Sequence, residues 1–483
     1  MRLPDTKLLL VLALAGCAGA QATQAPAPAA ERPAPAGADA QKAPKFAGAL
    51  SRPGVDAFPS TYKAPTSRAT VIRNVNIYTA AGPLVRNGSI LLVDGKVSAV
   101  GATVNAPAGA EVIDGQGKYV TPGLIDTHSH LGVYPAPGTA AHNDGNEATA
   151  PVTAHVWAEH SVWPQDPQFP RVLAGGTTVI QVLPGSANLI GGRGVTLKVV
   201  PARSVQEMKF PGAPHGLKMA CGENPKRVYA ARGPSTRMAN VAGYRAAWIQ
   251  AEQYRRRWDK WLEKEEGDPP ARDLGQETLA EVLRGNILIH NHCYQADEMM
   301  NMIDIAKEFG YRIRSFHHGV ETYKIADMLA REGISASIWS DWGGFKMEAL
   351  DGIKANVGLT HAAGARTIVH SDDPSYSQRL NQEASKSLAA ARLAGLTISE
   401  EDAIKWITIN AAWALGIEGS TGSLEPGKNA DVVLWSSNPF SVYARPEKVW
   451  IDGALRFDRA DPSQRWRTDF ELGYVPDMTG GSR

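Results

Sequence analysis

Residues 120–130 read VTPGLIDTHSH, and this stretch decides the fold. Its apolar part predicts a short buried strand that ends in two histidines, His128 and His130. Because successive side chains of a strand alternate between its two faces, both imidazoles point the same way. Two imidazoles on one face suit Zn²⁺ or a similar divalent ion. A lone His-x-His is weak evidence, so the chain around it has to support the interpretation.

The sequence downstream alternates between short apolar stretches and helical ones, which is typical of βαβ units. Helices are clearest at 295–309, 321–332 and 381–395, and a charged, Trp-rich helix at 240–266 is expected to pack on the outside. The alternation predicts an α/β fold with a (β/α)8 TIM barrel over residues 122–415. Its eight candidate strands end near His130, His155, Leu183, Gly222, His292, His318, Ser337 and Ser371.

Both ends of the barrel region are flanked by segments with strand periodicity. Apolar and polar side chains alternate in residues 69–78, 89–100 and 111–120. A similar strand-like pattern is present near the other end of the chain, in residues 431–435 and 448–457. We therefore expect one small β-sandwich domain assembled from residues 66–121 and 416–470.

The N-terminus has the features of an export signal. Residues 8–15 read LLLVLALA after Arg2 and Lys7, and residues 14–17, ending in Cys17, resemble the bacterial lipobox. This predicts a lipoprotein signal peptide over 1–17, a lipid anchor on Cys17, and export to the cell envelope, in the periplasm or at the outer membrane. A simple secretory signal is the alternative. The Ala- and Pro-rich residues that follow predict a disordered linker over 18–65.

Composition narrows the possible functions. Fifty basic and 49 acidic residues leave a net charge of +1, which gives no electrostatic case for nucleic-acid binding. Without Cys17, only Cys221 and Cys293 remain, too few for a disulfide framework and without zinc-finger spacing. A metal site would have to use histidines and carboxylates. The oligomeric state has no sequence signal.

The His-x-His behind residues 122–126 (PGLID) and an N-terminal β domain closely resembles the first-strand motif of the amidohydrolase superfamily, in its prolidase- and imidazolonepropionase-like branch. The resemblance covers residues 69–458. It implies a divalent metal site of one or two Zn²⁺, with further ligands after strands five, six and eight. These correspond to His292, His318 and Asp372. His318 is chosen over His317, and His290 lies deeper in the strand.

Two residues are candidates for a ligand that bridges two metals. Residues 215–227 resemble the fourth-strand segment of prolidase-like members, which implies a carboxylated Lys218 between two metals. Glu223 is the rival, and a regular strand would not point both inward because they are five residues apart. With both structural, the site would be mononuclear. If Lys218 points inward, Cys221 and Cys293 face the helices from neighbouring strands, close enough to oxidise in an exported protein.

Two further features belong to the expected active site. Residues 184–194 lack the ending of a phosphate loop and are expected to shape a substrate pocket through backbone amides. Tyr294, two residues after His292, resembles a tyrosine of dipeptidase-like members that polarises the scissile carbonyl. The alternative is that Tyr294 only packs against its neighbours.

These features predict a metal-dependent hydrolase that cleaves a peptide-like or N-acyl amide bond of a small molecule. Metal-activated hydroxide would attack the carbonyl, with Asp372 as general acid and base. A deaminase of the same fold is an alternative, although Gln295 stands where nucleobase deaminases carry a glutamate. A lactonase is a second alternative, and a catalytically silent surface-binding lipoprotein is a third. A silent protein would be expected to lack one of the metal ligands, and none of the expected ligands is missing.

Overall fold

A curved sheet of eight strands forms the centre of the protein. The computed structural model describes residues 53–464 and 466–468, and the strands hydrogen-bond in the order β13-β12-β11-β10-β9-β8-β7-β6. Near the mouth, the amide of Asp372 donates to the carbonyl of His128 at 3.0 Å and so joins the last strand to the first. The fold is a nearly closed (β/α)8 barrel. Its strands are β6 (Leu124–Ser129), β7 (Thr177–Val182), β8 (Ile190–Lys198), β9 (Gly216–Ala220), β10 (Leu288–Cys293), β11 (Ile313–His318), β12 (Ser335–Ile338) and β13 (Thr367–Val369).

One strand departs from the regular barrel and corrects the sequence prediction. β8 pairs antiparallel with both β7 and β9, and it occupies part of the stretch that the glycines had marked as a loop. The strand expected to end near His155 does not form, because residues 152–157 make only isolated bridges to β8. A Cβ at Gly192 would lie 2.3 Å from the carbonyl oxygen of Val156, so the glycines permit this close approach.

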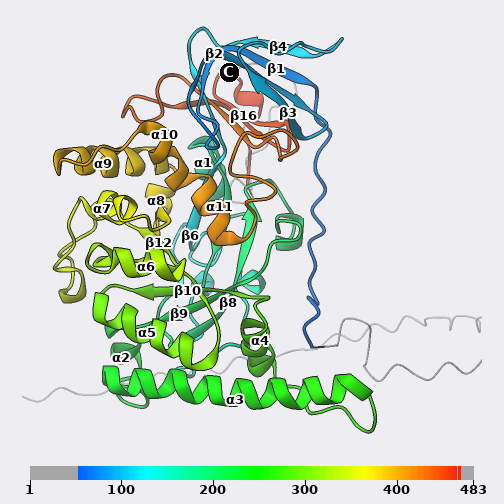
Figure 1. Ribbon diagram of the computed structural model, residues 1–483. Helices are drawn as coiled ribbons and strands as arrows, with labels where there is room; N and C mark the ends of the chain where they lie inside the picture. Colours follow the sequence, from blue (N-terminus) through cyan, green and yellow to red (C-terminus); the bar gives the residue numbers. More distant parts are fainter. Residues whose placement is uncertain (1–52, 465, 469–483) are drawn as a thin grey trace, which may run out of the picture. The chain divides into compact units, whose positions relative to one another are not determined.

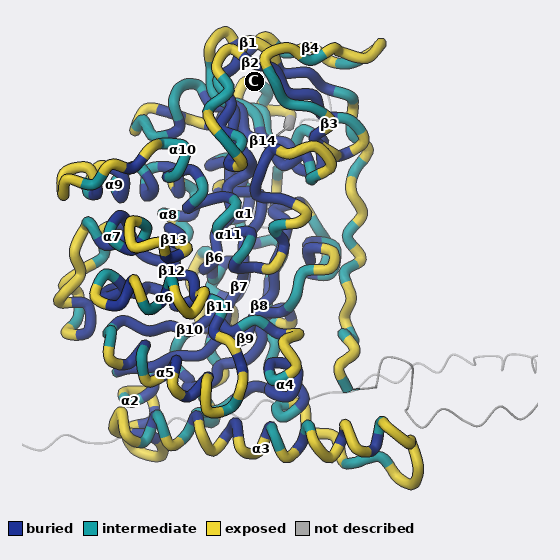
Figure 2. Tube along the Cα trace, viewed as in Figure 1, coloured by how far each residue is buried: buried dark blue, intermediate teal, exposed yellow. Residues whose placement is uncertain are grey.

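Helices surround the barrel strands, with their exposed faces turned outward (Figure 2). The three helices predicted at 295–309, 321–332 and 381–395 are present as α5, α6 with a preceding 3₁₀ turn, and α9. The helices are α1 (Gln168–Ala174), α2 (Glu223–Tyr229), α3 (Arg237–Lys264), α4 (Leu274–Leu283), α5 (Ala296–Phe309), α6 (Ala326–Glu332), α7 (Asn356–Ala362), α8 (Pro374–Ser377), α9 (Leu380–Leu393), α10 (Glu400–Ala403) and α11 (Ile409–Leu415).

The Trp-rich helix α3 packs on the outside of the barrel, as the sequence predicts. It begins after Thr236, whose side chain accepts a hydrogen bond from the amide of Ala239. Tyr244 and Trp248 are buried on the face that contacts the barrel, and the helix runs along α4 and α5 in Figure 1. Burial of these large rings accounts for a helix that is otherwise strongly charged.

Residues 70–122 and 432–458 meet in a second sheet, drawn in blue to cyan and in orange to red in Figure 1. The predicted β-sandwich is, in its hydrogen bonding, one eight-stranded sheet of order β16-β15-β14-β5-β1-β2-β3, with β4 beside β1. β14 from the C-terminal part pairs with β5, which leads through Gly123 directly into β6. Its strands are β1 (Thr70–Ile77), β2 (Val85–Val93), β3 (Lys96–Gly101), β4 (Glu111–Asp114), β5 (Tyr119–Pro122), β14 (Val432–Trp435), β15 (Pro446–Ile451) and β16 (Ala454–Asp458).

The segment before β1 is more ordered than predicted. Residues 53–65 belong to the expected linker, yet Asp56 forms a 2.7 Å ion pair with Lys209, and Tyr62 donates a hydrogen bond to Asp452. Buried partners on the barrel and on the sheet hold this segment, so residues 53–65 do not have the linker character that composition predicted. The predicted signal peptide, Cys17 and the first part of the linker lie outside the described residues. Within the described part, no helix combines the length and apolar character needed to span a bilayer.

Candidate metal centre and active site

The predicted site residues meet at the carboxyl end of the barrel strands. A cavity of about 620 Å³ opens there, where active sites of such barrels lie. Six of the seven predicted metal ligands and the predicted catalytic tyrosine line this cavity. Lys218 is the predicted ligand that does not line it. The lining includes His128, His130, His292, His318, Asp372, Tyr294 and Glu223.

The two histidines of the first strand converge on the carboxylate after the last strand. The Nε2 atoms of His128 and His130 each lie 3.2 Å from Oδ1 of Asp372. The imidazole of His130 is fixed on its other side, where Nδ1 lies 2.8 Å from the carbonyl oxygen of Leu183. These three side chains form a set whose ligand atoms lie close enough to hold one metal ion. The donor set of two imidazoles and a carboxylate suits Zn²⁺.

Two residues of the cavity wall, His318 and Asp372, have unusual backbone conformations. His318 and Asp372 have φ angles of 70° and 63°, in the left-handed region that non-glycine residues rarely adopt. Both stand where a strand of the barrel turns into its loop. Strain of this kind persists only where surrounding contacts enforce it, and it gathers at functional sites.

Burial keeps the imidazoles of the cluster neutral. It lowers the pKa values of His128, His292 and His318 well below the ordinary value, and the pKa of His370 falls to about 3 for the same reason. Neutral imidazole is the form that coordinates metal. The Nδ1 atoms of His292, His318 and His370 are buried without a hydrogen-bond partner among the described residues. Buried nitrogens without a partner are free to bind a metal ion, and the ligand atoms of His318 and His370 lie close to that of His128.

His370 is a site residue that sequence reasoning missed. Its ligand atom lies with those of His128 and His318 in a second group that could hold an ion. His370 stands two residues before Asp372, so strand parity could have drawn attention to it. Its ring nitrogen Nε2 accepts from the amide of His318 at 3.3 Å, which ties the ends of β11 and β13 together.

A chain of imidazoles lies behind the cavity. His317 contacts His128 through two Nδ1 atoms 2.9 Å apart, and its Nε2 lies 2.9 Å from Nδ1 of His290. His317 and His290 are buried and line no part of the cavity. They orient His128 so that its Nε2 faces Asp372, as outer partners of metal ligands do. Of the adjacent pair His317 and His318, only His318 reaches the cavity.

Lys218 lies beneath the cluster, on β9. Its Nζ is 3.1 Å from Nε2 of His128, and the side chain is almost completely buried. Burial lowers the pKa of Lys218 to about 7, against the opposing attraction of the Asp372 carboxylate. An amine with such a pKa is substantially uncharged at neutral pH, which is the form that can react with CO₂.

Glu223 occupies a different element, so the parity argument, which held for one regular strand, does not apply to the pair Lys218 and Glu223. β9 ends at Ala220, Gly222 turns the chain with φ of 81°, and Glu223 begins α2. Its carboxylate lines the cavity but lies 3.4 Å from the ammonium of Lys346. Glu223 therefore has an ion-pair partner, whereas Lys218 contacts the histidine cluster directly.

Tyr294 borders the cavity beside two candidate ligands. Its ring centroid lies 4.7 Å from that of His292 and 5.5 Å from that of His318. Burial raises the pKa of Tyr294, and the carboxylates of Asp372, Glu348 and Glu223 add to the shift. The phenol therefore stays protonated and can donate a hydrogen bond.

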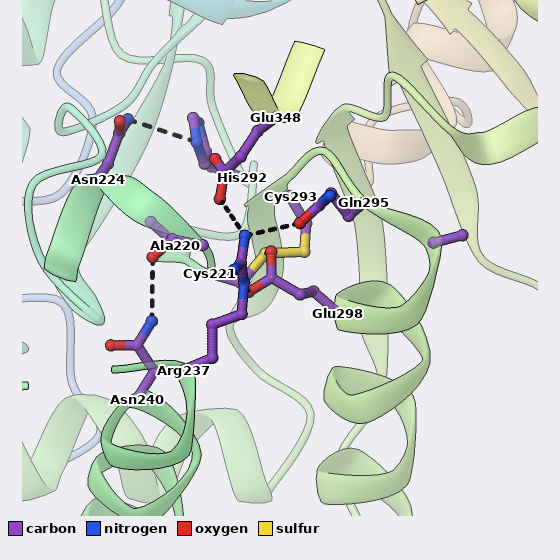
Figure 3. Close-up of a disulfide and its surroundings, with 12 residues drawn as sticks. Ala220, Cys221, Asn224, Arg237, Asn240, His292, Cys293, Gln295, Glu298 and Glu348 are labelled. Carbon is purple, nitrogen blue, oxygen red and sulfur yellow. Dashed lines mark hydrogen bonds and ion pairs between the residues drawn. A yellow bond between two sulfur atoms is a disulfide. The ribbon is translucent and has the colours of Figure 1, made fainter. Parts of the chain in front are cut away.

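A disulfide joins the two strands that carry Lys218 and His292. Cys221 and Cys293 are bonded, with their Cα atoms 5.3 Å apart, which confirms the neighbouring positions inferred from strand parity. In Figure 3 the bridge lies below His292, and the side chain of Arg237 extends beside it toward Glu348 and Gln295. The bridge thus links the ends of β9 and β10 beside the candidate ligands.

Comparison with known proteins agrees with this geometry. Residues 215–457 match the model of the amidohydrolase family. The chain belongs to the amidohydrolase family. A crystal structure of an amidohydrolase from Thermotoga maritima superimposes with a TM-score of 0.74 at 35% identity, over 81% of this chain and all of that one. Membership makes the protein a hydrolase that acts on carbon–nitrogen bonds, in a family that generally uses divalent metals.

Two curated relatives show how far the similarity extends. The amidohydrolase tasK of Hapsidospora irregularis is 33% identical over 398 residues, which are 78% of this amidohydrolase but only 40% of that protein. An imidazolonepropionase of Mesorhizobium japonicum is 27% identical over 399 residues, covering 76% of this chain and 91% of the relative. The chain thus spans less than half of the first relative and most of the second.

Proposed function

We propose that the protein is a metal-dependent hydrolase that cleaves the amide bond of a small peptide-like or N-acyl substrate. Two overlapping groups of ligand atoms carry this proposal: His128 and His130 with Asp372, and His128 with His318 and His370. The donor set fits one or two Zn²⁺ ions, held by the histidines and by Asp372. Such an ion, when bound, lowers the pKa of water toward about 7 and so supplies hydroxide at neutral pH.

Asp372 is the group that we propose moves the proton. Its Oδ1 faces both first-strand imidazoles, while Oδ2 lies 3.9 Å from His318, and the carboxylate reaches the cavity. A carboxylate in this position can accept a proton from the nucleophile and return it to the leaving amine. Tyr294, protonated and at the cavity wall, is the proposed hydrogen-bond donor to the substrate carbonyl.

Lys218, carboxylated on Nζ, is the proposed bridging ligand when two ions bind. Three observations favour it over Glu223: its contact with His128, its pKa of about 7, and its position directly beneath the cluster. The ion pair between Glu223 and Lys346 instead gives Glu223 a role in the cavity wall.

A deaminase is disfavoured by the segment after β10. Gln295 accepts a hydrogen bond from Arg237 at 2.7 Å and does not line the cavity. An amide cannot donate and accept protons as a carboxylic acid does, so this position supplies no proton donor.

We further propose that the protein is exported and anchored to the bacterial envelope through Cys17. The lipobox-like residues 14–17 support the anchor. The bond between Cys221 and Cys293 supports an oxidising compartment, because disulfides are rare in the cytosol.

The test of the proposed function combines metal analysis with a substrate panel. The purified protein should contain zinc or a related divalent metal and hydrolyse some dipeptides or N-acyl amino acids faster than lactones. His128→Ala with His130→Ala should remove most bound metal and abolish turnover, while His142→Ala, an exposed histidine outside the cavity, should preserve both. Full metal content in the folded double variant would contradict the site assignment.

A further inference from the structure

The charged side chains of the cavity wall sum to zero, but only one ion pair forms among them. Four charged side chains line the cavity: Arg227, Lys346, Glu223 and Asp372. Lys346 is compensated, since its ammonium lies 3.4 Å from Glu223 and 3.7 Å from the buried Glu348. Asp372 faces the histidine cluster. Arg227 is the cation of the wall that has neither carboxylate within ion-pair distance.

Arg227 has no carboxylate within ion-pair distance in the described part of the chain. It is exposed on α2 and faces the cavity. Burial is the main cause that lowers the pKa of Lys346, and the positive charge of Arg227 lowers it further. The two cations therefore lie near each other in the wall. An exposed guanidinium without a partner, at the edge of a site that binds small molecules, is available to an anion.

The position of Arg227 relates this free cation to the reaction centre. Asn224 lies three residues earlier on α2, hence on the same helix face, with Cβ atoms of such pairs about 5–6 Å apart. The amide nitrogen Nδ2 of Asn224 is 3.5 Å from Nε2 of His292, as Figure 3 shows. Arg227 therefore lies about one helical turn from the histidine cluster. An anion bound to it would belong to the same small molecule as an amide bond held at the cluster.

We propose that Arg227 binds a carboxylate adjacent to the scissile amide, and that the substrates are N-acyl amino acids or dipeptides with a free C-terminal carboxylate. This inference rests on the proposed amide hydrolysis. A single unpaired guanidinium matches a monoanion, and the planar fork of arginine donates two hydrogen bonds to a carboxylate. Glu223 and Asp372 in the same wall would repel a group of higher negative charge.

The test compares each substrate with its amide-capped form. N-acetyl-L-leucine and N-acetyl-L-leucinamide are one pair, and Ala-Leu and Ala-Leu amide are another; the apolar side chain suits the exposed Phe345 and the neighbouring Trp342 on the wall. Wild type should favour the free acid in kcat/KM by about tenfold, a value at the low end for a charge-assisted pair because Arg227 is exposed. Added salt should reduce the preference.

Substitution of Arg227 should remove this preference. Arg227→Met should bring the acid-to-amide ratio near one through a rise in KM for the acid, and Arg227→Lys should retain part of it. Lys226→Met is the matched control, because it removes a neighbouring charge that does not line the cavity. It should keep the wild-type ratio. An unchanged ratio in Arg227→Met, with amides still hydrolysed, would overturn the inference and leave the proposed function intact.

A binding experiment separates the two proposals. Calorimetric titration of the zinc-loaded protein with L-leucine and with L-leucinamide compares the carboxylate with its neutral amide without requiring turnover. Tighter binding of leucine, lost in Arg227→Met and kept in Lys226→Met, supports the carboxylate site even if no amide in the panel is cleaved. Equal binding of both compounds to wild type would overturn it.

Discussion

Removing the disulfide between Cys221 and Cys293 should lower the stability of the protein and leave the fold in place. The bridge spans a sequence separation of 72 residues. Loop-closure entropy for a crosslink of that length is worth about 4 kcal/mol, since the open chain has more conformations when unfolded. Both cysteines are buried, so alanine at both positions also leaves a small void. For a unit of this size, we expect Cys221→Ala with Cys293→Ala to lower Tm by about 5 °C.

Calorimetric unfolding of wild type and double variant, with and without dithiothreitol, measures this effect. The reductant should lower the Tm of wild type toward that of the double variant and should not change the variant. Thiol labelling of denatured wild type should find neither cysteine free before reduction. Two labelled thiols, or a double variant that melts within 1 °C of wild type, would refute the reasoning. Turnover should fall modestly, because the bridge lies beside His292 and not in the cavity.

The remaining predictions concern single side chains. Asp372→Asn should retain much of the metal, because the histidines remain, and lose turnover by at least about 100-fold, because the amide cannot move the proton; near-wild-type rates across the pH range would point to another base. Lys218→Ala should lower the metal count toward one per chain and cut turnover, with partial rescue by short carboxylic acids, whereas Glu223→Ala should be milder; the opposite order in metal analysis would identify Glu223 as the bridge. Cys17→Ser should move the expressed protein from the membrane to the soluble fraction, because the anchor needs the thiol, and membrane retention at high salt would count against a lipid anchor.

Local pattern predicted most of the fold because periodicity reports burial. The apolar stretches before His128, His292 and His318 are strands, and the amphipathic stretches that follow His292 and His318 are helical. The prediction of strands failed at two places, where hydrogen bonding between strands, and not the side-chain pattern, decides the secondary structure. The glycines near Gly192 indicated a loop, but they permit close packing of β8, while the apolar alternation around His155 runs in an irregular segment. Strand pairing across the barrel decides such cases.

By itself the sequence determined most of the residues that could carry the chemistry, since the spacing of His128 and His130 on a strand already sets the direction of both side chains. It also placed Cys221 and Cys293 on one side of their strands. Only the tertiary structure decided which distant groups meet. His370 joins the cluster, Arg227 is left without a partner, and Glu223 leaves the strand for a helix. The physical reason is that strand parity is a local property of the backbone. Proximity between residues far apart in sequence depends instead on the path of every loop between them, and no single segment encodes that path.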